Sequence, residues 1–131
     1  MPEKTNNGLL WVIGIVLILL GVVYFSLMGT QSGTLKIGVI TPLTGDAASY
    51  GTAMQRAYDL AAGEINASGG VDGQQIELVY EDGKCEGVSA TTAAQKLISI
   101  DQVDFILGGT CSGETLAAAE LTQEARVLLL S

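Results

Sequence analysis

The residues best suited to chemistry lie in one short segment, 109–113, which reads Gly-Thr-Cys-Ser-Gly. Placed between a strand-like run and a helix-like run, the pattern G-x-C-x-G is typical of a nucleophile elbow, with Cys111 as the nucleophile. Such a cysteine needs a general base, normally histidine, and the 131-residue chain contains no histidine. We therefore expect a protein that is not an enzyme and has no catalytic residues, and keep a Cys111 enzyme as a minor alternative.

The sequence contains no clear pattern for a metal ion or a cofactor. Cys85 and Cys111 are the two cysteines, which are too few for a cysteine zinc site in a chain without histidine. The glycines at positions 108, 109 and 113 do not form the dinucleotide-binding pattern G-x-G-x-x-G, because Thr110 occupies the middle position. We expect no metal and no cofactor.

Charge and apolarity divide the chain into two regions. Residues 9–28 include 17 apolar side chains among 20, whereas the residues after position 28 carry 5 basic and 13 acidic side chains, which accounts for the net charge of −8. An acidic body with so few cations is poorly suited to neutralise a phosphate backbone. We therefore expect no nucleic-acid partner.

Residues 9–28 would span about 30 Å as a helix, which matches the hydrocarbon core of a bilayer. Trp11 lies near one end of this run, and Tyr24 and Phe25 lie near the other, where aromatic side chains suit the membrane interface. The sequence predicts a single-pass transmembrane signal-anchor in the cell membrane, with residues 1–8 cytoplasmic, residues 29–33 as a linker and an extracytoplasmic body, periplasmic or extracellular. A cleaved signal peptide is the alternative, although its apolar region is usually shorter.

The body alternates between strand-like and helix-like segments with short connections. We expect strands at 34–41, 75–81, 104–108 and 127–130, and helices at 51–68, 89–100 and 113–125. This alternation predicts an α/β domain of three layers, in which right-handed βαβ units build a parallel, Rossmann-like sheet with helices on both faces.

The expected strand order is 2-1-3-4, with a switch point between the first and third strands, beyond whose carboxyl ends ligands bind. Two loops meet there, at 42–50 and 109–112, and we expect the functional site between them. The chain stops inside its fourth apolar run, and an open parallel sheet needs further elements to cover its faces. Residues 34–131 are therefore expected to be the front part of a longer protein.

Several segments of the body together resemble one protein family. Residues 36–45 read KIGVITPLTG, residues 48–51 read ASYG, and residues 64–73 read EINASGGVDG, with Glu81 and Asp82 at the end of the second strand. On these residues the body resembles the N-terminal lobe of type I periplasmic solute-binding proteins, specifically the branched-chain amino-acid (Leu/Ile/Val) receptors of ABC importers.

This resemblance implies an extracytoplasmic receptor with two lobes that close on a small molecule, an amino acid or a similar solute. The receptor would deliver the solute to an ABC permease in the membrane. A membrane sensor that uses the same lobe as its ligand-binding ectodomain is the alternative, because an importer component and a sensor look alike in this part of the chain.

In the family that the chain resembles, a serine and backbone N–H groups at a helix start after the third strand hold the α-carboxylate of the ligand. The resemblance assigns this role to Thr110, Cys111 and Ser112. The free N–H groups and the positive dipole end of a helix start suit a carboxylate. For Ser112, a role as a simple helix cap is the alternative.

Two further ligand-binding residues follow from the same resemblance. Tyr50 matches an aromatic residue that lies across the ligand, with packing against the first helix of the body as its alternative role. Ser131 matches the first serine of a further ligand-binding motif, whose remaining residues would follow it.

The resemblance also implies a disulfide between Cys85 and Cys111, because some members of the family have bonded cysteines at these places. Both residues follow strands at the same edge of the expected sheet, and an environment outside the membrane permits the bond. In the strand order 2-1-3 the bond has to cross above the first strand.

Overall fold

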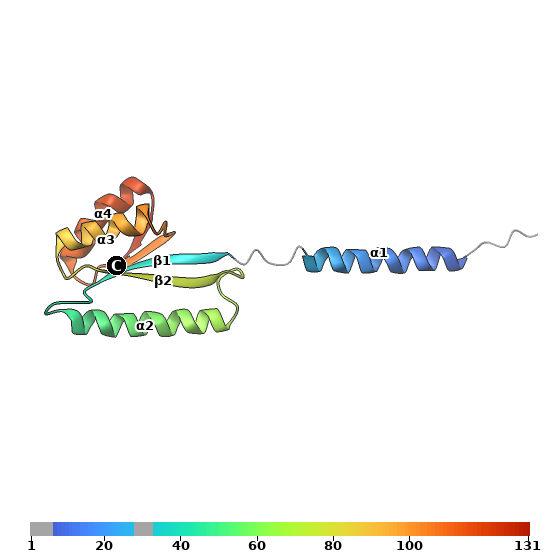
Figure 1. Ribbon diagram of the computed structural model, residues 1–131, viewed down its shortest axis with the longest axis horizontal. Coiled ribbons are helices and arrows are strands. Elements are labelled where there is room, and N and C mark those ends of the chain that lie inside the picture. The colour runs from blue at the N-terminus through green and yellow to red at the C-terminus, as the bar shows by residue number, and fades with distance from the viewer. Residues whose placement is uncertain (1–6, 28–32) are drawn as a thin grey trace, which may run out of the picture. The chain divides into compact units, whose positions relative to one another are not determined.

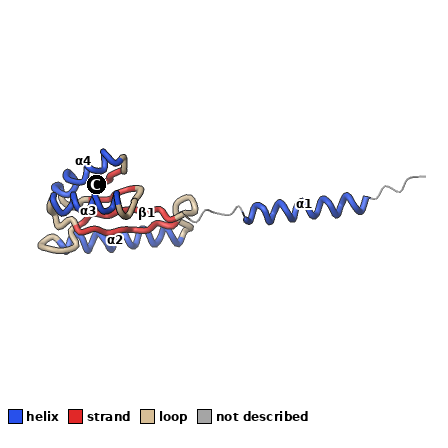
Figure 2. The backbone as a smooth tube through the Cα atoms, turned by 45° about the horizontal axis from the view of Figure 1, so that its top comes forward, coloured by secondary structure: helices blue, strands red, loops and turns tan. Residues whose placement is uncertain are grey.

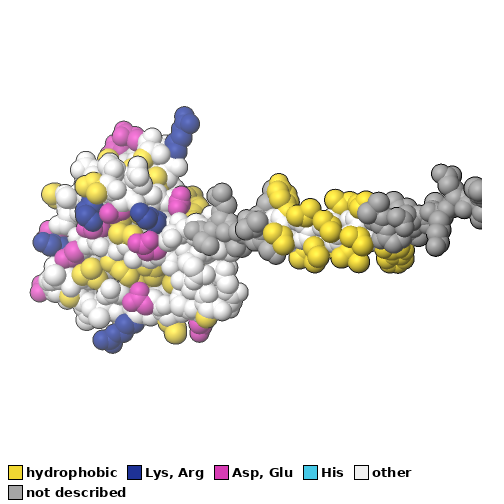
Figure 3. Space-filling model, turned by 45° about the vertical axis from the view of Figure 1, so that its right-hand side comes forward, with side chains coloured by type: hydrophobic (Ala, Val, Ile, Leu, Met, Phe, Trp, Pro, Cys, Tyr) yellow, Lys and Arg dark blue, Asp and Glu magenta, His cyan; other side chains and the backbone are white. Residues whose placement is uncertain are grey.

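A computed structural model describes residues 7–27 and 33–131 of the chain, which belong to two separate units. The first contains helix α1 (Asn7–Leu27). Its side chains from Trp11 to Tyr24 are mostly apolar and exposed (Figure 3).

A helix is therefore present over most of residues 9–28. Among the described residues, however, no helix meets the combined requirements of length and apolarity for crossing a membrane. The transmembrane signal-anchor predicted for this segment is not supported. The cytoplasmic location of residues 1–8 and the linker at 29–33 stay predictions, and residues 1–6 and 28–32 lie outside the described part of the chain.

The second unit is built on a parallel sheet of four strands (Figure 1). The strands are β1 (Thr34–Thr41), β2 (Gln75–Asp82), β3 (Phe105–Gly108) and β4 (Leu128–Leu130), in the order β2-β1-β3-β4. Strand β1 pairs with both β2 and β3, so that Ile37 lies between Leu78 and Phe105. The strand order and the parallel pairing predicted from the sequence are confirmed.

Three helices connect the strands, namely α2 (Ala48–Ala67), α3 (Gly87–Ser99) and α4 (Ser112–Ala125). Helix α2 begins three residues earlier than predicted, because Ala47 and Ala48 favour a helix and the Ala47 carbonyl already accepts the Gly51 N–H. Tyr50, expected in a loop, therefore lies in the first turn of α2. Helix α4 likewise includes Ser112, one residue before its predicted start.

The helices cover both faces of the sheet, with α2 on one face and α3 and α4 on the other (Figures 1 and 2). On the first face, the Tyr80 hydroxyl of β2 donates to the Asp59 carboxylate of α2 at 2.7 Å. Burial, followed by the hydrogen bond to Asp59 and its charge, raises the pKa of Tyr80, which keeps the phenol protonated as a donor. On the second face, Leu97 of α3 lies directly over Gly38 of β1. The predicted three-layer architecture is confirmed.

The core lies between the sheet and the pair of helices α3 and α4. Strands contribute branched side chains to it, whereas the helices contribute mainly alanines, whose small size lets the helices approach the sheet closely. Its buried members are Ile40, Ala90, Ala93, Ala94, Leu97, Val103, Ile106 and Ala118. This packing fixes the starts of α3 and α4 relative to the carboxyl ends of the strands.

Replacing Leu97 by alanine should lower the free energy of unfolding by about 2–5 kcal/mol, because the change removes buried methyl groups and leaves a cavity above Gly38. The matched control is Ile100→Ala, just beyond the same helix, where the side chain is 72% exposed. That variant should change stability by no more than about 0.5 kcal/mol. Urea unfolding followed by circular dichroism measures both, and equal losses would contradict this placement of the core.

Candidate functional site

The loops that follow β1, β2 and β3 lie at the carboxyl edge of the sheet. They consist of residues 42–47, 83–86 and 109–111, and the loop after β1 is the middle one because β1 lies between the other two strands. The site predicted from the sequence falls at this edge.

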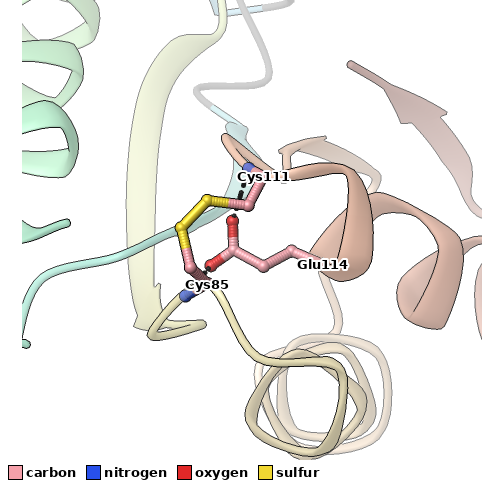
Figure 4. A group of neighbouring side chains, drawn as sticks. All are labelled: Cys85, Cys111 and Glu114. Atoms are coloured by element: carbon pink, nitrogen blue, oxygen red, sulfur yellow. Dashed lines mark hydrogen bonds between the residues drawn. A yellow bond between two sulfur atoms is a disulfide. The ribbon is translucent and has the colours of Figure 1, made fainter. Parts of the chain in front are cut away.

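Cys85 and Cys111 form a disulfide, with their Cα atoms 5.3 Å apart (Figure 4). The structure thus shows the pairing that the family resemblance implies, and the interpretation of Cys111 as a nucleophile is wrong because its sulfur is bonded. The bond joins the loops after β2 and β3, which β1 separates in the sheet. It links residues 26 positions apart, and in the chain-entropy model such a link contributes about 3.5 kcal/mol to stability.

Glu114, in the first turn of α4, lies directly beneath this disulfide. Its side chain is fully buried. One carboxylate oxygen accepts the Cys85 N–H at 3.0 Å and the other accepts the Cys111 N–H at 2.9 Å. This role was not predicted from the sequence, although an acidic residue three positions after the residue that caps a helix is a known signal for such a backbone contact.

Asp82 organises the neighbouring loops at the end of β2. Its carboxylate accepts the Leu43 N–H at 2.8 Å and the Lys84 N–H at 3.0 Å, and it also accepts the Thr44 hydroxyl and N–H. Partial burial by itself would raise the pKa of Asp82, but the hydrogen bonds from Thr44, Leu43 and Lys84 outweigh it and hold the pKa below its ordinary value. Asp82 therefore ties the loop after β1 to the loop after β2.

Two successive residues of the loop after β2 have left-handed backbone conformations. Lys84 has φ 54° and Cys85 has φ 58°, and such conformations cost non-glycine residues about 1–3 kcal/mol each. Each of these residues donates its N–H to one of the two carboxylates, Lys84 to Asp82 and Cys85 to Glu114. The carboxylates thus stabilise a loop shape that the backbone does not prefer by itself.

The structure places Ser112 as the first residue of α4, with an exposed side chain. The residue that caps the helix is Cys111, so the alternative role of Ser112 as the cap is wrong. Within residues 33–131, no hydrogen bond is found for the Ser112 hydroxyl. The N–H groups of Ser112 and Gly113 lie in the first turn, where a helix offers them no acceptor.

Thr110 has a different environment from Ser112. Its hydroxyl lies 2.8 Å from the hydroxyl of the buried Thr41 and 3.2 Å from the sulfur of Met54. The side chain therefore joins the loop after β3 to β1 and α2, and its hydroxyl already has partners within the protein.

Tyr50 lies one helical turn before Met54 on α2, and its side chain is 69% exposed. The alternative that Tyr50 packs against the helix is therefore not supported. Ser131 directly follows β4 and is exposed. The Thr110–Met54 contact brings the start of α4 and the first turns of α2 to the same edge, whereas no hydrogen bond joins Ser131 to these residues in the described part of the chain.

A possible metal-ligand cluster consists of Cys85, Cys111 and Glu114, whose side-chain ligand atoms lie within 4.8 Å of one another. Both sulfurs are used by the disulfide, and both carboxylate oxygens accept N–H groups. These residues are therefore not available as ligands in the oxidised chain.

A separate groove lies between the carboxyl-terminal halves of α3 and α4. It is lined by Ile98, Leu121 and Ala125, among others, beside the ion pairs of Lys96 with Glu81 and Asp101. The hydrogen bonds that Lys96 donates to the carboxylates of Glu81 and Asp101 raise the pKa of Lys96. None of the predicted ligand-binding residues lines this groove.

Comparison with known proteins decides the family. Residues 34–131 match the model of the periplasmic binding protein family. The chain belongs to this family. The resemblance to branched-chain amino-acid receptors is confirmed, and the relatives of this periplasmic binding protein are solute-binding proteins rather than enzymes.

Three relatives illustrate the similarity. The leucine-, isoleucine-, valine-, threonine- and alanine-binding protein of Pseudomonas aeruginosa is 38% identical over 108 residues, which cover 82% of this chain and 28% of that protein. The crystal structure of the branched-chain amino-acid transporter substrate-binding protein LivJ of Streptococcus pneumoniae, in complex with isoleucine, matches with a TM-score of 0.70 and 42% identity, over 73% of this chain and 28% of that one.

An ABC-transporter solute-binding protein of Rhodopseudomonas palustris, in complex with 3,4-dihydroxybenzoic acid, matches with a TM-score of 0.66 and 35% identity. The match covers 73% of this chain and 26% of that one. The chain thus spans less than a third of the length of each of these relatives.

The role of Asp82 predicts a specific dependence of stability on pH. Because folding lowers the pKa of Asp82 from its ordinary value of 3.8, the stability that it contributes is complete above that value and is lost as the pH falls through the lower pKa of the folded state. Asp82→Asn should lower the free energy of unfolding at neutral pH by about 1–2 kcal/mol and should flatten the acid limb of the stability curve.

Urea unfolding between neutral and acidic pH measures this effect. The matched control is Asp46→Asn in the loop after β1, where the side chain is exposed. If the acid limb of Asp82→Asn had the same slope as that of Asp46→Asn, the assignment to Asp82 would be wrong.

Proposed function

We propose that residues 34–131 form part of the ligand-binding lobe of an extracytoplasmic receptor for an ABC importer. Its ligand is a small carboxylate, of the branched-chain amino-acid class, which is bound between this lobe and a second one. The observation that carries the proposal is the first turn of α4, where an exposed hydroxyl and two backbone N–H groups without helical acceptors lie together at the carboxyl edge of the sheet.

The first turn of α4 has the chemistry of a carboxylate site. The N–H groups of Ser112 and Gly113 lie at the positive end of a helix of 14 residues, where a negative charge is stabilised. The Ser112 hydroxyl adds a third donor. Glu114 does not compete for these donors, because both of its oxygens accept other N–H groups.

Tyr50 is the residue that we assign to the rest of the ligand. Its ring is exposed on the first turn of α2, which Met54 and Thr110 connect to the start of α4. An exposed aromatic ring covers an aliphatic or aromatic ligand side chain equally well. We further assign the backbone of Thr110 and Cys111, and Ser131, to the edge of the same cleft.

The ligands of the relatives support a carboxylate as the recognised group. One relative is in complex with isoleucine and another with 3,4-dihydroxybenzoic acid. These two molecules share a carboxylate and differ in everything else. We infer that this part of the lobe recognises the carboxylate, and that selection among ligand side chains depends mainly on other parts of the receptor.

Two-dimensional ¹H–¹⁵N NMR of the chain tests the proposal, with leucine and leucinamide as matched probes. Leucinamide has the same side chain and amino group but lacks the carboxylate. Leucine at millimolar concentrations should shift the amide signals of Ser112 and Gly113, whereas leucinamide should leave them in place.

Ser112→Ala should weaken the effect of leucine by about tenfold, because it removes a hydrogen bond to a charged group. Ser99→Ala, an exposed serine at the end of α3, is the control and should behave like the unmodified chain. Equal shifts with leucine and leucinamide, or no shift with either, would contradict the proposed carboxylate site.

A further inference from the structure

Glu114 connects the two cysteine-bearing loops through hydrogen bonds, independently of the disulfide. It reaches from the first turn of α4 to the N–H of Cys85 in one loop and to the N–H of Cys111 in the other, at 3.0 and 2.9 Å (Figure 4). The side chain has no exposed surface. A buried carboxylate that accepts two N–H groups holds their two loops together strongly, because hydrogen bonds to charged groups are stronger than those between neutral groups.

The backbone conformation around Cys85 depends on its hydrogen bond to Glu114. Cys85 has φ 58°, a left-handed conformation, and follows Lys84 in the same conformation. In this geometry the Cys85 N–H points toward Glu114, and the side chain reaches Cys111 (Figure 4). Without the acceptor, a return of Cys85 to an ordinary backbone conformation would redirect both its N–H and its sulfur.

Two glycines, which have no side chains, leave room for the Glu114 carboxylate. A Cβ atom at Gly83 would overlap the Glu114 carboxylate, and a Cβ atom at Gly109 would overlap the Glu114 Cβ. One glycine lies in each cysteine-bearing loop, two positions before its cysteine. Both loops therefore approach the Glu114 side chain more closely than any residue with a side chain would allow.

We propose that Glu114 is a positioning residue for the disulfide. Its carboxylate accepts an N–H group from each of the two loops and so holds Cys85 and Cys111 opposite each other before the disulfide forms. When the bond is reduced, the same contacts keep the loops and the start of α4 in place. This role of Glu114 does not depend on the identity of the ligand.

Oxidation in a glutathione buffer tests the proposal. One cysteine thiolate attacks oxidised glutathione and releases one reduced glutathione, and the second thiolate then attacks the mixed disulfide and releases another. The two cysteines are oxidised and one oxidised glutathione is reduced to two thiols. The equilibrium ratio of bonded to reduced chain gives the effective concentration of the thiol pair.

Glu114→Gln should lower this effective concentration by about tenfold, because the amide of glutamine offers an acceptor to one N–H and a donor to the other. Glu86→Gln is the matched control. Glu86 directly follows Cys85 but is exposed, and its carboxylate accepts a hydrogen bond from the Ser89 hydroxyl. The control should match the unmodified chain, and an unchanged value for Glu114→Gln would overturn the proposal.

A second measurement stays decisive even if Glu114→Gln does not fold. In the chain with both Cys85→Ser and Cys111→Ser, the disulfide is absent but Glu114 is intact. The amides at positions 85 and 111 should remain protected from hydrogen exchange, whereas the amide of Gly113 should exchange rapidly. If the amides at 85 and 111 exchange as fast as that of Gly113 while the core amide of Ile106 stays protected, the carboxylate does not hold the loops.

Discussion

The buried contact of Glu114 with two backbone N–H groups is the interaction on which the carboxyl edge of this lobe depends. Strand β1 separates β2 from β3, so strand pairing does not bring the loops after β2 and β3 together. Glu114 and the disulfide above it join these loops across β1. Because Glu114 belongs to the first turn of α4, the same contact fixes where that helix begins, and thus where its free N–H groups lie.

Asp82 extends this arrangement to the third loop. It binds the backbone of Leu43 and Lys84, and so connects the loop that leads into α2 with the loop that leads to Cys85. The two carboxylates accept N–H groups from all three loops, whereas the N–H groups of Ser112 and Gly113 lie in the first turn of α4, where the helix itself offers no acceptor. The carboxylate ligand that we propose would supply one, which connects the local chemistry of the edge with the solute-binding family to which the chain belongs.

Much of the fold follows from the sequence, because alternating apolar periods predict strands and helices directly. β1 matches its predicted bounds, and the order β2-β1-β3-β4 follows from general rules for parallel sheets. The role of Glu114 was not predicted, since an acid in a first helical turn satisfies the helix dipole whether it is buried or exposed. Asp82 was identified only as part of a family motif, because its partner Leu43 lies 39 positions away and local patterns do not reveal such a contact. The membrane-spanning anchor, inferred from the length and apolarity of residues 9–28 and the aromatic residues near its ends, is the prediction that the described residues do not support.

The most direct test of this account asks whether the loops after β2 and β3 are covalently joined in the native chain. The chain is denatured without reductant, alkylated and digested, and its peptides are identified by mass spectrometry. We expect one pair of linked peptides, containing Cys85 and Cys111, and no alkylated cysteine. Two alkylated cysteines and no linked pair would contradict it, because the carboxyl edge would then lack the bond that Glu114 is placed to support.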